Sequence, residues 1–145
     1  MDDPFNLARF VAAQDGIYDV ALSEIRGGSK RSHWMWFVFP QIAGLGLSPI
    51  SKRYAIASAD EARAYLDHPV LGARYRECVD TLQRLPGSSA EKVFGHVDAQ
   101  KLQSSLTLFS AIRADGLFEA ALNRWFGAQR DETTLRLLKE QGHEG

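Results

Sequence analysis

The sequence predicts an all-α protein, an irregular bundle of about eight short helices that forms a single domain over residues 1–145. Apolar residues recur at three- and four-residue intervals through most of the chain, and helix-capping residues precede several of these stretches. No run of alternating apolar and polar residues indicates a series of strands. Helices of two or three turns are too short for a regular four-helix bundle, so the bundle is expected to be irregular.

The first third of the chain carries the less regular helices. Asp3 is expected to start the first of them, because its side chain can cap free amides and a proline follows at the first turn. A second helix is expected to end at Gly27. Residues 33–39 fit either a buried strand or a buried helix. A short helix that ends before Pro40 is favoured, because a lone strand would leave its backbone amides without partners.

Helix starts are clearer from residue 58 onward, after a turn of helix that is expected within residues 49–56. Ser58 with Glu61, and Ser88 with Glu91, have the spacing of capping boxes. Further helices are expected to start at Pro69, Asp98 and Asp131, and a helix around Phe118 is expected to end at Gly127.

The composition excludes several classes of protein. The 17 basic and 18 acidic residues are balanced, which argues against general nucleic-acid binding. The longest apolar run, residues 34–39, is too short to cross a membrane, and acidic residues stand where a secretory signal would carry cations. A cytoplasmic protein is therefore expected. The one cysteine, Cys78, cannot form an internal disulfide, and the oligomeric state stays open.

Charge is unevenly distributed along the chain. Residues 25–59 carry five lysines and arginines and no acidic residue, although the net charge of the whole chain is −1. A local positive field of this kind suits an anionic ligand, while a solvated basic surface is the other interpretation. The segment is therefore the first place to look for a binding site.

Within this segment, residues 27–41 combine small, cationic and aromatic residues in the string GGSKRSHWMWFVFPQ. In an anion cradle, the small residues let the backbone approach a ligand, while Lys30, Arg31 and Ser32 supply charge and hydrogen bonds. The spacing of a P-loop is absent, and a helix end followed by a solvated loop is the alternative. His33 is a candidate acid or base, or else a histidine bonded to a carbonyl beside the aromatic residues.

Aromatic and hydroxyl side chains extend the candidate site. Trp34 and Trp36 are two positions apart, so on a helix they cannot share a face. Either one is core while the other stacks on a base or sugar, or both are core. Lys101, Ser104 and Ser105 lie within about one turn of each other on a predicted helix. The two hydroxyls serve either close helix packing or contact with a polar ligand.

Metal ions and other cofactors are not expected. The histidines show no metal-ligand spacing and the one cysteine stands alone. The nucleophile motif G-x-S-x-G is also missing. The histidines are His33, His68, His96 and His143.

The strings GSKRSHWMWFVFPQIAGLGLS, RYAIAS, EARAYLDHPVLGARYRE and DAQKLQSSLTLF resemble a bacterial family catalogued as a domain of unknown function, whose members are often labelled "calpastatin". The resemblance covers nearly the whole chain and implies a small all-α fold. A calpastatin would be a disordered repeat chain, whereas this composition is that of a compact protein. In size and helical character the chain is also similar to domains that process ADP-ribose or related N-glycosides, which is an analogy of fold. The resemblance points to Lys30, Ser32, His33, Trp34, Gln41, Tyr54, Lys101, Ser104 and Ser105 as site residues.

Two functions follow as hypotheses. The first is a small-molecule anion-binding domain, a hydrolase or binder of a phosphorylated ligand such as a nucleotide or ADP-ribose. Lys30 and Arg31 would hold the phosphate, a tryptophan would stack on the base or sugar, and His33 would act as acid or base near Ser104 and Lys101. These side chains are then expected to converge on one pocket. The second is a non-catalytic interaction module whose basic loop docks an acidic partner.

Overall fold

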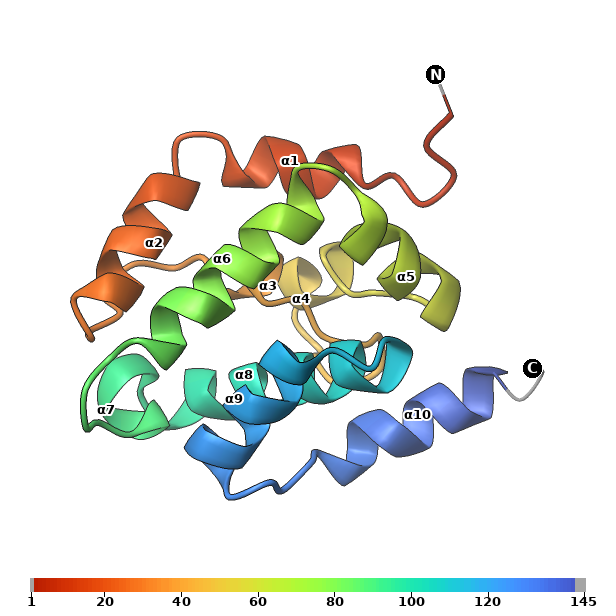
Figure 1. Ribbon diagram of the computed structural model, residues 1–145. Coiled ribbons are helices and arrows are strands. Elements are labelled where there is room, and N and C mark those ends of the chain that lie inside the picture. Colours follow the sequence, from red (N-terminus) through yellow and green to blue (C-terminus); the bar gives the residue numbers. More distant parts are fainter. Residues whose placement is uncertain (1, 143–145) are drawn as a thin grey trace.

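The computed structural model describes residues 2–142, so His143 lies outside the described residues. The all-α prediction is confirmed, with ten helices and no named strand in the described part of the chain (Figure 1). The count exceeds about eight because three helices have only four or five residues. The helices are α1 (Ala8–Gln14), α2 (Tyr18–Arg26), α3 (Met35–Val38), α4 (Pro49–Arg53), α5 (Ala59–Asp67), α6 (Leu71–Gln83), α7 (Ala90–Phe94), α8 (His96–Ile112), α9 (Gly116–Phe126) and α10 (Glu132–Gly142).

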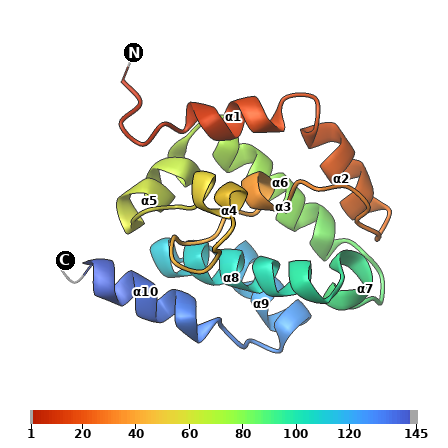
Figure 2. The ribbon, with the colours of Figure 1, turned by 180° about the vertical axis from the view of Figure 1, so that it is seen from behind.

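Helix α8 is the central element, and its 17 residues contact α5, α7, α9 and α10. Figures 1 and 2 show it crossing the molecule, with α10 along one side and α6 and α2 on the other. Leu102, Leu106 and Phe109 are fully buried, as the predicted apolar face requires. Ser104 and Ser105 are buried on the remaining sides, so most of this helix lies inside the protein.

The aromatic segment before Pro40 is the short helix that the sequence favours. Helix α3 spans Met35–Val38, and the rings that flank it, Trp34 and Phe39, are 0% exposed. The Phe39 ring packs edge-on against Tyr75 with ring centroids 5.5 Å apart. Beyond α3 the described chain forms one isolated parallel bridge, between residues 42 and 56. This bridge positions the loop that leads into α4.

Two of the predicted caps are confirmed, and a third is confirmed only in part. The predicted helix start at Asp3 is wrong, because α1 begins at Ala8, but the Asp3 carboxylate does accept hydrogen bonds from the backbone N–H groups of Leu7 and Ala8. The Ser58 hydroxyl accepts from the Glu61 N–H at 3.1 Å. At the last helix, the Asp131 carboxylate accepts from the backbone N–H of Thr134 at 3.0 Å.

Two other predicted helix starts are wrong. Ser89, not Ser88, caps α7, because burial of Ala90 sets the phase of this short helix and places the Ser89 hydroxyl over the N–H of Lys92. Asp98 does not cap α8, which already begins at His96. Gly95 makes the early start possible, because its φ of 84° turns the chain directly from α7 into α8.

Two further properties follow from this packing. Cys78 is fully buried, and burial raises the pKa of its thiol to about 12, which makes it an unreactive core residue. No helix in residues 2–142 has both the length and the apolar character that crossing a membrane requires.

Candidate functional site

The loop after α2 does form an anion cradle, and the chain's own Glu24 fills it. Glu24 Oε1 accepts from the N–H groups of Arg31 and Ser32, at 2.9 and 3.0 Å, and from the Trp34 indole N–H at 2.9 Å. Its Oε2 accepts from the Ser32 hydroxyl at 2.6 Å. The predicted binding groups of this loop are therefore occupied by an internal carboxylate. The role of Glu24 is not predictable from the sequence, because an acidic residue near the end of a helix is usually exposed to solvent and nothing in the sequence distinguishes Glu24 from such a residue.

This arrangement corrects two of the predicted ligand contacts. Trp34 is 0% exposed, so its ring has no free face on which a base or sugar can stack. Ser32 uses its hydroxyl and its backbone N–H on Glu24. The Arg31 side chain is exposed, and only its backbone N–H contacts Glu24. The cradle thus shapes the loop and directs its next residues toward α8.

The pKa of Glu24 reflects the same contacts. Burial alone would raise it, but the hydrogen bonds from the Ser32 hydroxyl, the two backbone amides and the Trp34 indole outweigh burial and lower the pKa from 4.5 to about 2. The carboxylate is therefore ionised at neutral pH. It stabilises the loop as a charged hydrogen-bond acceptor.

Stability is expected to fall in acid because of this group. The pKa of Glu24 is depressed in the folded state, so its stabilising effect is complete above pH 4.5 and is lost as the pH falls toward 2. At this partly exposed site the loss should be roughly 2 kcal/mol after allowance for solvent screening. Urea unfolding of the wild type and of Glu24→Gln between pH 2 and 7 measures it. A variant with the same acid-dependent loss as the wild type would contradict this assignment.

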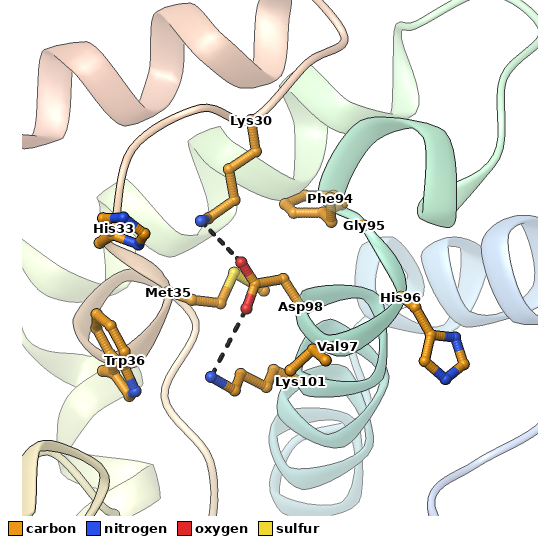
Figure 3. Close-up of a pocket in the computed structure, with 10 residues that line it drawn as sticks. All are labelled: Lys30, His33, Met35, Trp36, Phe94, Gly95, His96, Val97, Asp98 and Lys101. Carbon is orange, nitrogen blue, oxygen red and sulfur yellow. Dashed lines mark ion pairs between the residues drawn. The ribbon is translucent and has the colours of Figure 1, made fainter.

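A pocket of about 430 Å³ lies between this loop and the junction of α7 with α8 (Figure 3). The backbone N–H of Lys30 donates to the carbonyl of Val93 at 2.7 Å, which ties the loop to α7. The two walls come from segments that are far apart in sequence. They are lined by Lys30, His33, Met35, Trp36, Phe94, Gly95, His96, Val97, Asp98 and Lys101.

Two lysines and one aspartate form the charged part of the pocket. Lys30 Nζ lies 2.7 Å from Asp98 Oδ2, and Lys101 Nζ lies 3.6 Å from Asp98 Oδ1. Figure 3 shows the two lysines reaching Asp98 from opposite sides. The Lys30 side chain is 7% exposed, while that of Lys101 is 23% exposed. Lys101 is therefore the more accessible cation. The structure adds Asp98 to the residues expected from the sequence.

The wall that carries Lys30 also carries an imidazole and an indole. His33 is exposed and lies beside the Lys30 ammonium group, across from Asp98, in Figure 3. Trp36 lines the pocket, and Lys101 Nζ lies 5.1 Å from the centroid of its ring, within cation–π distance. Of the two tryptophans, Trp36 and not Trp34 is thus placed to touch a ligand. The two-residue spacing predicted that they would diverge, but not which would face the pocket.

The predicted convergence is corrected at the two serines of α8. Ser104 is 6% exposed, and its hydroxyl donates to the carbonyl of Gln100 at 3.1 Å, within its own helix. Ser105 is 0% exposed, and its hydroxyl pairs with that of Tyr75 at 2.9 Å. Neither lines the pocket. Their hydroxyls serve the packing of a helix that is surrounded on most sides.

Gln41 and Tyr54 lie beside the pocket and not in it. They line a separate hollow of about 10 Å³, whose wall includes Trp36. Trp36 therefore stands between the two spaces. A larger groove of about 840 Å³ lies elsewhere, between residues 2–15 and the junction of α5 with α6, and contains none of the predicted site residues.

The donor set of the pocket suits an anion. Two ammonium groups face one carboxylate, so the fixed charge of this trio is positive. The start of α8 has no side-chain cap and lies at the same place, which adds the partial positive charge of a helix N-terminus. Within residues 2–142, no three His, Cys, Asp or Glu side chains are grouped as a metal ion would require.

Fold and site together define a small all-α protein with a lysine-lined surface pocket. The chain belongs to the family described as "Protein of unknown function (DUF1810)", whose model matches residues 4–138. The crystal structure of the conserved hypothetical protein Rv1873 from Mycobacterium tuberculosis is similar, with 48% sequence identity and a TM-score of 0.92. The match covers 94% of this chain and 98% of that one.

No curated protein matches. The descriptions name neither a ligand nor calpastatin, so that label has no support here.

Proposed function

We propose that the pocket binds a phosphorylated small molecule of the nucleotide or ADP-ribose type. The observation that carries the proposal is that Lys30, His33 and Trp36 from one segment meet Lys101 from a distant helix around one hollow. A volume of about 430 Å³ is within the usual range for small-molecule sites. The cytoplasmic location stays a prediction from the sequence.

Each side chain has a role in this proposal. Lys101 contacts the phosphate, because it is the more accessible lysine and its ion pair with Asp98 is long. Lys30 is more deeply buried and adds positive charge on the inner side of the pocket. Trp36 offers an aromatic face for a base or sugar. In a hydrolytic reaction, His33 is the candidate acid or base, since its imidazole faces the pocket.

Replacing Lys101 with methionine should weaken binding of ADP-ribose and ADP by about tenfold or more, because one charge-assisted contact to phosphate is lost. Isothermal titration calorimetry with both ligands measures the change. Lys52→Met is the matched control, because Lys52 is exposed on α4 and away from the pocket. Equal affinities of the two variants would contradict the assignment of Lys101.

A second pair of variants distinguishes an enzyme from a binding protein. His33 faces the charged part of the pocket, whereas His96 lines the rim with its ring directed away from Asp98 in Figure 3 and pairs with Glu91 at 3.0 Å. If the bound ligand is hydrolysed, His33→Gln should lower turnover by about 100-fold while His96→Gln leaves it unchanged. If a ligand binds without turnover, the protein is a binder. If no phosphorylated ligand binds, the alternative of a helical interaction module that docks an acidic partner replaces the proposal.

A further inference from the structure

We infer that Asp98 makes the pocket selective for a ligand that carries a hydroxyl close to its phosphate, as a sugar phosphate does, over a phosphate group alone. This inference rests on the proposed function and deepens it. The relevant contacts are those of the two oxygens of the Asp98 carboxylate, which are not equivalent.

The inner oxygen, Oδ2, is the one paired with Lys30. Oδ2 lies 2.7 Å from Lys30 Nζ, and the Lys30 side chain is 7% exposed. Lys30 Nζ also donates to the carbonyl of Ser32 at 2.5 Å. Because its ammonium group pairs with Asp98, donates to the Ser32 carbonyl and has little exposed surface, Lys30 serves mainly to hold Asp98 in place.

The outer oxygen remains free for a ligand. Oδ1 lies 3.6 Å from Lys101 Nζ, which is too long for a hydrogen bond, and it accepts no other hydrogen bond from the described residues. The Asp98 side chain is 21% exposed. The pocket thus presents a cationic donor and an anionic acceptor side by side, both reachable from solvent.

This donor and acceptor pair is complementary to a hydroxyl next to a phosphate. The phosphate oxygens accept from Lys101, and the hydroxyl donates to Asp98 Oδ1. A phosphate monoester without such a hydroxyl has lost its own proton above about pH 7, so it would place negative oxygens directly against that carboxylate, which is unfavourable. Inorganic phosphate keeps one proton at neutral pH, but it brings the same charge toward the carboxylate and has no ring to contact Trp36. Trp36, whose ring centroid lies 5.1 Å from Lys101 Nζ, gives the sugar ring a flat surface beside both groups.

Calorimetric titration of the wild type with ribose 5-phosphate, tetrahydrofurfuryl phosphate and inorganic phosphate tests the inference without any mutation. Tetrahydrofurfuryl phosphate keeps the ring and the phosphate but lacks the ring hydroxyls. Ribose 5-phosphate should bind about tenfold or more tightly than either of the others, because a pocket that bonds a hydroxyl discriminates against an analogue without one. Equal affinities for the three would overturn the inference.

The variant Asp98→Asn tests which residue is responsible. It keeps the shape but removes the charged acceptor, so the preference for ribose 5-phosphate should fall below about threefold, while inorganic phosphate binds more tightly. A variant that keeps the wild-type preference would show that Asp98 is not the cause. If the three compounds bind equally and Lys101→Met weakens all of them, the hydroxyl selectivity is wrong but the proposed function stands. If none of the compounds binds, the selectivity and the proposed function are both wrong.

Discussion

Replacing Glu24 with alanine is expected to lower the free energy of unfolding by about 4 kcal/mol, because four hydrogen-bond donors lose one charged acceptor. Two of them are backbone N–H groups, one is the Ser32 hydroxyl and one is the Trp34 indole N–H. Trp34 is fully buried, so its N–H has no water to replace the carboxylate. The loop that carries Lys30 and His33 should also become more mobile, because Glu24 no longer holds Arg31 and Ser32.

Urea denaturation of three variants measures this effect. Asp19→Ala is the control, because Asp19 is an exposed acid on the same helix. Glu24→Gln keeps the shape and an acceptor oxygen but loses the charge, so it should cost roughly half as much as the alanine variant. A loss below about 1 kcal/mol for Glu24→Ala would mean that this carboxylate does not organise the loop.

Replacing Asp98 with alanine is expected to cost about 3 kcal/mol, because Lys30 stays almost completely buried and loses its counter-charge. The same change leaves an opening beside two lysines. Phosphate from solution should enter that opening and restore part of the stability, as any ligand does that binds only the folded state. The variant should therefore be stabilised by phosphate more than the wild type is.

Thermal unfolding in phosphate and in chloride at equal ionic strength tests this rescue. Asp80→Ala is the matched control, because the ion pair of Asp80 with Arg84 is exposed on α6 and far less buried than that of Asp98. The rise in Tm with phosphate should be largest for Asp98→Ala and the same for the control and the wild type. Equal rises in all three would show that no anion site is opened at Lys30.

Much of the fold is predictable because its signals are local. The apolar face of α8 and the caps at Asp3, Ser58 and Asp131 each depend on residues within one or two turns. Neighbouring serines are harder to separate by spacing alone. Ser89 caps α7 in place of Ser88 because a buried alanine, which is a tertiary contact, decides the phase of the helix.

The site is predictable only in part. Lys30, His33 and Lys101 stand out as polar residues beside aromatic ones, and the structure brings them to one pocket. Glu24 and Asp98 do not stand out, because an acid that binds a distant loop looks like any helical surface acid in the sequence. Ser104 was predicted to face a ligand but is buried. Its burial comes from contacts of α8 with four other helices, which the spacing of residues along the sequence does not reveal.

The central claim is that a phosphorylated ligand binds between the loop that carries Lys30 and the start of α8. Titration of the isotope-labelled protein with ADP-ribose, followed by amide chemical shifts in NMR spectra, tests it most directly. The account predicts shifts concentrated in residues 30–36 and 95–101, the two segments that contribute most of the residues lining the pocket. Shifts concentrated instead in the groove of residues 2–15, or no shifts at millimolar ligand, would contradict it.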